Sequence, residues 1–224
     1  MMKAKFLNSE LMYDFDEFDL LTLVIENRTA LFKYLRYLNN DFRGEESYWK
    51  IAKDNDSIPI DEVADFIPNL FSLEINSKKN VNALYKILKK TYYEKLREEM
   101  SSLKDKVSKI IKEICLDFDL ELVISNDLKE DDLFKIMDLR FEDSGLSEKE
   151  KVIKYCITIN ELRGVCVFFF VSLHTFFSDE DLSSMINELK YRRIKLFNLE
   201  TSSILSNITR ERVLIFDNDL CVIS

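Results

Sequence analysis

Glycine and proline are scarce in this sequence, and their scarcity limits both its fold and its chemistry. The 224 residues include three glycines (Gly44, Gly145 and Gly164) and two prolines. Average usage is about 7% glycine and about 5% proline, so collagen-like, low-complexity and turn-dense all-β chains are excluded. A Walker A phosphate loop needs the pattern G-x-x-x-x-G-K, and a dinucleotide-binding loop needs G-x-G-x-x-G. The closest two glycines here are 19 residues apart, so neither loop is present.

The net charge of −9 by itself argues against a nucleic-acid partner, because phosphate binding depends on Lys and Arg. The charge is unevenly distributed along the chain. Residues 78–112 carry 11 basic and 4 acidic groups, whereas 1–77 carry 8 and 15, 113–150 carry 4 and 13, and 151–224 carry 9 and 9. A segment of net +7 therefore lies between two acidic segments, and the total charge does not exclude a nucleic-acid partner.

The size and composition are those of a globular protein that buries one substantial core. The longest apolar runs, 20–25 and 165–171, are far shorter than the ~18 residues that span a bilayer, and the chain does not open with a signal-peptide pattern. We therefore expect a cytoplasmic protein without a membrane partner. The four cysteines show no C-x-x-C spacing and His174 is the only histidine, so we expect no zinc site.

Apolar periodicity predicts an α/β domain with a helical insertion. The clearest pattern lies in the last third, where strands at 165–171, 194–199 and 212–216 surround a capped helix at 178–192. Continuous apolar strands separated by a helix indicate a mostly parallel sheet that is covered on both faces. Further elements are predicted at 3–7, 12–15 and 20–25 (strands), 28–38 (helix), 47–52, 60–66 and 70–75 (short elements) and 147–162 (a helix with a Ser-x-x-Glu capping box). The predicted domains are 1–76 with 146–224 (α/β) and 77–145 (helical leg).

The predicted strand 20–25, a tight turn at Glu26 and Asn27, and the helix that follows have the order of a phosphate-loop unit. The turn offers an acidic side chain where such a loop has glycines. We therefore expect no bound anion at this turn.

A basic stripe is predicted along the first helix of the insertion. At 100° per residue, its cations fall within an arc of about 100°, opposite the apolar residues; they are Lys79, Lys86, Lys89, Lys90 and Arg97. A second helix at 102–116 places Lys106, Lys109 and Lys112 outward and its apolar residues inward, which predicts a helical hairpin. The stripe has the spacing to bind a nucleic-acid backbone, and Lys106 and Lys109 of the second helix are predicted to bind DNA with it. The alternative is a solvated face of a lysine-rich chain.

Acidic residues are concentrated after this hairpin, in a predicted strand at 117–123 and a short helix that begins at Asn126 or Asp127 and ends at Met137. Seven carboxylates lie within sixteen residues: Asp119, Glu121, Asp127, Glu130 and Asp131, together with Asp117 and Asp132. Oxygen ligands without His or Cys suit Ca²⁺. Helix capping and solubility are the alternative explanation.

Catalysis finds little support in the sequence. His174 follows a predicted strand but has no fixed nucleophile partner, so it is interpreted as a polar loop residue. Asp217 and Asp219 after the last strand are interpreted as a C-terminal turn. We therefore predict no catalytic residue.

Several segments resemble the CRISPR-associated Csn-two family, the fourth adaptation protein of type II-A systems. The match is strongest in VCVFFFVSLHTFFSDEDLSSMINELKYRRIKLFNLE and RVLIFDNDLCVI. LLTLVIENRTALFKYL, VADFIPNLFSLEINSKKNVNALYKIL and LDFDLEL are similar to the family's opening, its mid-chain block and the acidic segment near its calcium sites. These segments cover nearly the whole chain in the family's order.

The resemblance implies a P-loop-NTPase-like α/β head without a functional phosphate loop and an extended α-helical leg. It implies a homotetrameric ring, stabilised by Ca²⁺, that encircles double-stranded DNA without sequence preference and acts in spacer acquisition. The partners implied are the CRISPR integrase proteins and the RNA-guided effector nuclease. Its calcium ligands correspond to Asp119 and Glu121, and to Asp127, Glu130 and Asp131. An enzymatic activity is not implied.

Two other functions remain open from the sequence. A protein-interaction adaptor of the adaptation complex would have charged arms and no DNA affinity of its own. A P-loop-like ATPase would need the glycines and the lysine that are missing here.

Overall fold

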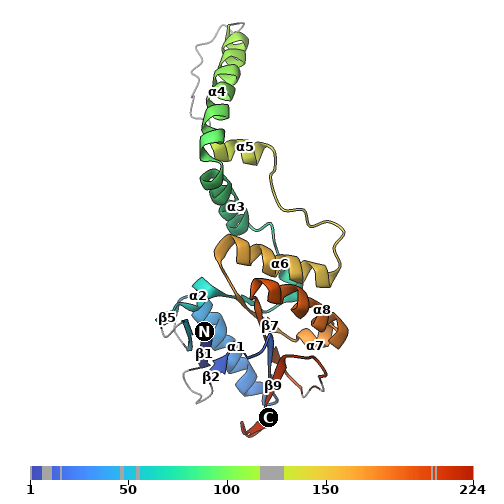
Figure 1. Ribbon diagram of the computed structural model, residues 1–224. Helices are drawn as coiled ribbons and strands as arrows, with labels where there is room; N and C mark the ends of the chain where they lie inside the picture. The colour runs from blue at the N-terminus through green and yellow to red at the C-terminus, as the bar shows by residue number, and fades with distance from the viewer. Residues whose placement is uncertain are drawn as a thin grey trace. The chain divides into compact units, whose positions relative to one another are not determined.

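The computed structural model describes residues 2–6, 12–15, 17–45, 48–53, 56–116, 129–202, 204 and 206–223. The chain divides into two compact units, which are described separately. Unit 1 comprises Met1–Ile75 and Asp143–Ser224, and unit 2 comprises Asn76–Glu142. Figure 1 shows the elements of both units in chain order by colour.

Unit 1 is built around a six-stranded sheet with the order β10-β9-β3-β8-β7-β6. Its neighbouring strands pair in parallel except for β10, which is antiparallel to β9. The strands are β3 (Leu20–Ile25), β6 (Ala64–Ile67), β7 (Val167–Val171), β8 (Lys195–Glu200), β9 (Glu211–Phe216) and β10 (Val222–Ile223). The predicted α/β class with a mostly parallel sheet is confirmed.

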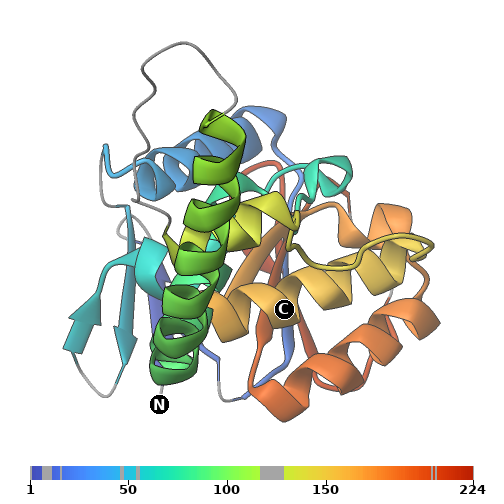
Figure 2. The same cartoon turned by 90° about the horizontal axis from the view of Figure 1, so that it is seen from above.

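Helices cover both faces of this sheet, as Figure 2 shows from above. One face packs against α1 (Arg28–Phe42), and the other packs against α6 (Glu148–Arg163) and α8 (Asp179–Leu189). Along β3, Leu21 and Leu23 enter the first core, whereas Leu20 enters the second. Successive side chains of a strand point to opposite faces, so a strand that is covered on both sides is apolar throughout.

A smaller antiparallel sheet adds to the core beside α1. Its order is β2-β1-β4-β5, with β1 (Met2–Phe6), β2 (Met12–Asp14), β4 (Trp49–Lys53) and β5 (Asp56–Ile58). Trp49 and Ile51 of β4 are buried and pack into the same core as α1. The strands predicted at 3–7 and 12–15 are confirmed, and they pair with each other.

The short connections of unit 1 include one strand that the sequence did not reveal as part of the sheet. The short element predicted at 60–66 is α2 (Ile60–Val63) followed by β6, which pairs in parallel with β7 at the sheet edge. The remaining short helices are η1 (Leu70–Ser72), α7 (Leu173–Phe176) and η2 (Lys190–Arg192). The capping box that opens α6 is present: the Ser147 N–H donates to Glu150 Oε2 at 2.8 Å, and the Glu150 N–H donates to Ser147 Oγ at 3.4 Å.

The turn between β3 and α1 is two residues long, as predicted. Asn27 is the N-cap of α1, and its Oδ1 accepts a hydrogen bond from the Ala30 N–H at 3.0 Å. The amide of Asn27 also donates to the carbonyl of Asn218 at 2.9 Å. Asn27 therefore caps the helix at the place in the unit where a phosphate loop would present its backbone N–H groups to a ligand.

Unit 2 consists of α3 (Lys78–Thr91), α4 (Tyr93–Cys115) and α5 (Glu130–Ile136) within the residues that the structure describes. Two hydrogen bonds join the ends of the unit: the Asn76 amide donates to the Phe141 carbonyl at 2.9 Å, and the Phe141 N–H donates to Asn76 Oδ1 at 2.8 Å. They tie together two segments that are 65 residues apart in the sequence.

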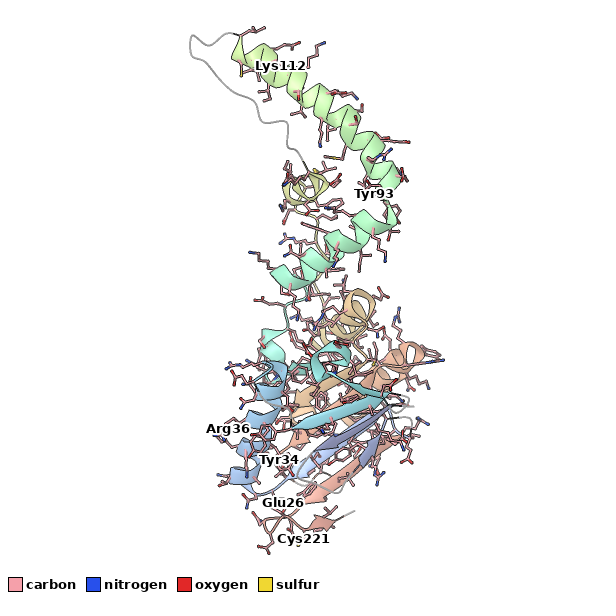
Figure 3. The ribbon with its side chains drawn as sticks, turned by 90° about the vertical axis from the view of Figure 1, so that its left-hand side faces the viewer. Glu26, Tyr34, Arg36, Tyr93, Lys112 and Cys221 are labelled. Carbon is pink, nitrogen blue, oxygen red and sulfur yellow. The ribbon has the colours of Figure 1, made fainter. Side chains whose placement is uncertain are left out.

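The predicted helical hairpin is wrong. The first helix ends at Thr91, before Arg97, and α4 runs on from a bend beside Tyr93 instead of folding back along α3, as Figure 3 shows. Tyr92 links the two helices with φ −115° and ψ 25°, outside the helical region. No glycine or proline marks this break, so the sequence did not reveal it.

The predicted strand 117–123 and the predicted cap at Asn126 or Asp127 lie outside the described residues. The short helix α5 begins at Glu130, with Lys129 as its N-cap residue. Among the helices that the structure describes, none has the length and the apolar composition that crossing a bilayer would require.

Candidate functional site

The basic residues of unit 2 are concentrated on α3. This helix has five lysines and no acidic residue, whereas α4 has six basic and five acidic residues. Of the predicted set, Lys79, Lys86 and Lys90 are exposed on α3. Lys78, the first residue of the helix, is also exposed and adds a fourth exposed lysine to α3. The sequence prediction did not include it.

The orientation of α3 is set by its apolar face. Tyr85 is buried; its ring lies 5.1 Å from that of Phe134 on α5, and its hydroxyl donates to the Leu139 carbonyl at 3.1 Å. Asn80, five residues earlier, is buried as well. At 100° per residue and with Lys86 at about 0°, Asn80 and Tyr85 lie at about 120° and about 260°, on either side of the direction opposite the lysines. These contacts therefore keep Lys79, Lys86 and Lys90 toward solvent.

Lys89 differs from the other lysines of α3. Its ammonium nitrogen lies 3.2 Å from Asp131 Oδ1 and 3.9 Å from Glu130 Oε2, and the three side chains are about one third exposed. The charge of Lys89 is therefore shared with two carboxylates of unit 2. The sequence placed Lys89 on the basic stripe because periodicity does not show which acids pack beside it.

Arg97 does not continue the stripe of α3, because it lies on α4. At 100° per residue, Arg97 lies about 120° to 180° away from Lys106 and Lys109, so these three predicted residues do not form one face. Lys106 and Lys109 are exposed among the acids Glu98, Asp105 and Glu113. The outer surface of α4 thus has mixed charge, unlike that of α3.

Of the five apolar residues of α4 that were predicted to face inward, Leu103 is half-buried and the other four are exposed. Val107 and Ile111 have about 40% of their surface accessible, and Ile110 and Ile114 have 55%. Met100, nearer the start of the helix, is buried. The hairpin that would have covered these residues does not form.

The structure describes two of the five predicted calcium ligands, Glu130 and Asp131, in the first turn of α5. Asp119, Glu121 and Asp127 lie outside the described residues. In the part of the chain that is described, no three side chains of His, Cys, Asp or Glu are grouped so that they could hold a metal ion. Glu130 and Asp131 offer the hard oxygen donors that Ca²⁺ prefers, and they are paired with Lys89.

Asp132, which follows these two acids, has a structural role. The Lys129 N–H donates to Asp132 Oδ2 at 3.0 Å, and Lys135 donates to Asp132 Oδ1 at 3.3 Å. These hydrogen bonds hold the pKa of Asp132 below its usual value. Helix capping, the alternative that the sequence left open, therefore accounts for this one member of the acidic cluster.

In unit 1, His174 is part of a buried polar cluster and not a free loop residue. Its Nε2 lies 2.8 Å from Glu211 Oε1 at the start of β9, and its ring is 7% exposed. Glu211 also accepts hydrogen bonds from Thr22 and Ser206. The serine donates to the carboxylate and not to the imidazole, so this is not the order of a nucleophilic triad.

The sequence missed this cluster because His174 and Glu211 are 37 residues apart and no motif connects them. The interpretation of Asp217 and Asp219 as a turn is supported: Asp217 Oδ1 accepts from the Asp219 N–H at 2.9 Å and from the Cys221 N–H at 2.8 Å.

Comparison with known proteins gives one family. A family model described as CRISPR-associated protein (Cas_Csn2) matches residues 41–220 of the chain, which is the family that the sequence segments resemble. No curated protein matches the chain.

Solved structures give distant similarities. An ATP-binding cassette of an ABC transporter in its ADP conformation is 10% identical, with a TM-score of 0.41, over 91% of this chain and 82% of the other. A putative ABC transporter ATP-binding protein from Pyrococcus furiosus is 11% identical, with a TM-score of 0.40, over 95% and 96% of the two chains.

Proposed function

The chain belongs to the CRISPR-associated protein family Cas_Csn2, and on that premise we propose that it binds double-stranded DNA without sequence preference. Membership of the family implies a role in CRISPR adaptation. We propose that the protein performs this role as a non-enzymatic homotetrameric ring, stabilised by Ca²⁺, in spacer acquisition.

The observation that carries the proposal is the charge of α3. Lys78, Lys79, Lys86 and Lys90 are exposed on a helix without an acidic residue. Lysines that neutralise DNA phosphates release condensed counterions, which supplies affinity independently of sequence. No motif for reading base edges is needed for this kind of binding.

The length of α3 supports an assembly of several copies. Its 14 residues span about 21 Å, which limits one copy to a few phosphate contacts. Four copies that present α3 to one duplex would multiply these contacts and would raise the effective affinity through multivalency. This is the physical reason for proposing several copies, and the number four is what the family resemblance implies.

Calcium is proposed as the bound cation because the acids near α3 are oxygen donors only. Glu130 and Asp131 on α5 would contribute to its ligand set, with Asp119, Glu121 and Asp127 as the further proposed ligands. A bound Ca²⁺ would supply positive charge at a place where several carboxylates are close in sequence. Glu130 and Asp131 themselves hold α5 beside Lys89 of α3.

The partners proposed with DNA are the CRISPR integrase proteins and the RNA-guided effector nuclease. The α/β unit is proposed to be a P-loop-NTPase-like head that has lost its phosphate loop. The two-residue turn after β3, which Asn27 closes, supports this proposal.

The test compares binding of a blunt 30-base-pair duplex by the wild-type protein and by two variants of equal charge change, in Ca²⁺ and in EDTA. One variant carries K79E, K86E and K90E on α3, and the other carries K106E, K109E and K112E on α4. We expect binding by the wild type in Ca²⁺, a loss in EDTA, and a much larger loss for the α3 variant than for the α4 variant.

The salt dependence of binding provides a second measurement. Each lost phosphate contact lowers the slope of log K against log salt by about 0.9, so the α3 variant should lose a slope of nearly three per copy. Equal affinities of the wild type and the α3 variant would contradict the role of α3. An absence of wild-type binding in both Ca²⁺ and EDTA would contradict the proposed function as a whole.

A further inference from the structure

The outer face of α1 in unit 1 is a second surface where cations gather without acids. At 100° per residue, the exposed residues of this helix fall within an arc of about 140°; they include Arg28, Lys33, Arg36 and the C-cap residue Arg43. The rest of the arc is Thr29, Asn39, Asn40 and Phe32. Figure 3 labels Arg36 on this outer side and Tyr34 on the side toward the sheet.

The only acid of α1 does not neutralise this face. Asp41 is buried on the inner side, where its two carboxylate oxygens accept hydrogen bonds from the Tyr48 and Trp49 N–H groups, both at 2.7 Å. Glu26 and Glu45 lie beyond the two ends of the helix. The exposed face itself therefore carries four positive charges and no negative charge.

The four cations are not engaged in ion pairs with any residue that the structure describes. Two of them surround one aromatic ring instead: Lys33 Nζ lies 5.6 Å, and the Arg36 guanidinium carbon 6.0 Å, from the ring centroid of Tyr37. Tyr37 in turn stacks on Tyr48 of the segment before β4 at 3.8 Å. The Tyr37 ring, which stacks on Tyr48, thus lies next to both cations.

This arrangement is unfavourable without a partner. Like charges three residues apart on a helix repel one another, as Lys33 and Arg36 do. Unit 1 carries 18 basic and 27 acidic residues, so acids to neutralise the face are available, and none is placed on it. An anionic ligand would remove the repulsion.

We propose that the outer face of α1 binds the phosphate backbone of duplex DNA, as a site separate from α3. This inference rests on the proposed DNA binding and adds a second contact surface to it. From Arg28 to Arg43 the face spans about 22 Å, a length that offers several phosphates. Three of its four cations are arginines, whose planar guanidinium binds phosphate oxygens in pairs, and its threonine and asparagines add neutral donors.

The test uses the double variant R28E/R36E and a matched control, K190E/R193E. Both change the charge by −4 at exposed positions of unit 1, and η2, which carries Lys190, follows α8 on the opposite face of the sheet. Glu at Arg28 is compatible with the first turn of a helix, and Glu at Arg36 is a good helix former. Far-ultraviolet circular dichroism and a thermal melt check that both variants are folded.

Binding is measured by fluorescence anisotropy with a blunt 30-base-pair duplex at several NaCl concentrations, in Ca²⁺. We expect R28E/R36E to bind about tenfold more weakly than the wild type at moderate salt, with a salt slope lower by about two per copy. The control should stay within about twofold. Combining R28E/R36E with K86E/K90E should add the two losses in log K, because separate sites act independently.

The outcomes separate this inference from the proposed function. If R28E/R36E binds as the wild type does while the α3 variant is weak, the α1 site is wrong and DNA binding by α3 stands; the cationic face then fits an acidic protein partner. If R28E/R36E and the control lose affinity equally, the effect is one of net charge and the site is also wrong. If F32A alone weakens binding as much as R28E/R36E, contact with the phosphate backbone is not the mode of binding.

Discussion

The structure places His174 in a buried environment that the sequence did not predict. Burial alone would lower its pKa, but the hydrogen bond and the charge of Glu211, with the charges of Glu200 and Asp179, raise the pKa above its ordinary value. Glu200 is held in place by the His174 N–H at 2.9 Å and the Asn198 amide at 3.0 Å. The imidazole therefore joins α7 to β9.

A raised pKa in the folded state has a direct consequence for stability. The contribution of His174 is complete below the unfolded-state pKa of about 6.5 and is lost as the pH rises through the folded-state pKa. Because the chain has a single histidine, the proton on Cε1 of its ring gives one resonance in an NMR titration. We expect a pKa above 6.5 for the wild type and a lower one for E211Q; a wild-type pKa at or below 6.5 contradicts the assigned pairing.

Lys89 provides a second prediction at the scale of single residues. If Glu130 and Asp131 bind Ca²⁺, the ammonium of Lys89 competes with the metal for the same oxygens. K89Q should then bind Ca²⁺ about fivefold more tightly, which corresponds to the ~1 kcal/mol that a charge at about 4 Å contributes in water. Isothermal titration calorimetry measures this difference.

The control for Lys89 is K135Q. Lys135 pairs with Asp132, next to the proposed ligands and outside their set, at 3.3 Å. K135Q should leave the Ca²⁺ affinity nearly unchanged. Equal affinities of K89Q and K135Q would show that the carboxylates beside Lys89 do not bind the metal.

At the scale of elements, β3, its turn and α1 have the strand-turn-helix order that the sequence predicts, and the turn has no phosphate loop. Strand and helix follow each other as in phosphate-binding units, and Asn27 caps the helix where glycines would bind phosphate. A loop of two residues has too few backbone N–H groups to surround a triphosphate.

This element predicts that the protein does not hydrolyse ATP. Phosphate release from ATP and Mg²⁺ should be undetectable with and without duplex DNA. A P-loop ATPase assayed in parallel confirms that the conditions support hydrolysis. Release that DNA stimulates and that an excess of unlabelled ATP competes away would contradict the non-enzymatic function.

The helices of unit 2 show where element-level prediction fails. Helical periodicity was correct for α3 and α4 as helices, but their boundary was misplaced by about ten residues because Tyr92, an ordinary helix-compatible residue, occupies it. The error moved Arg97 onto the wrong helix and produced a hairpin. It also led to an inward orientation for apolar residues of α4, such as Ile110 and Ile114, that are exposed.

At the scale of the whole molecule, net charge is a poor guide to function. Unit 2 carries 14 basic and 14 acidic residues, and unit 1 accounts for the entire −9. The exposed lysines of α3 and the cationic face of α1 each lie in a unit that is neutral or acidic overall. Electrostatic attraction to DNA depends on the charges within about one Debye length, ~10 Å, of the phosphates, so individual faces are what count.

The sequence alone determined the features that depend on local or compositional signals. The scarcity of glycine excluded a phosphate loop, continuous apolar runs identified β3, β7 and β8 as buried parallel strands, and the Ser147 capping box located the start of α6. Each of these follows from backbone requirements that act within a few residues.

Only the tertiary structure decided which charges are available to a ligand. It paired Lys89 with Glu130 and Asp131, and it brought His174 to Glu211. It buried Asp41 on the inner side of α1, which left the outer face of that helix without an acidic residue. Such pairings join residues that packing brings together across the chain, and the period of a helix states which residues share a face but not what lies against it.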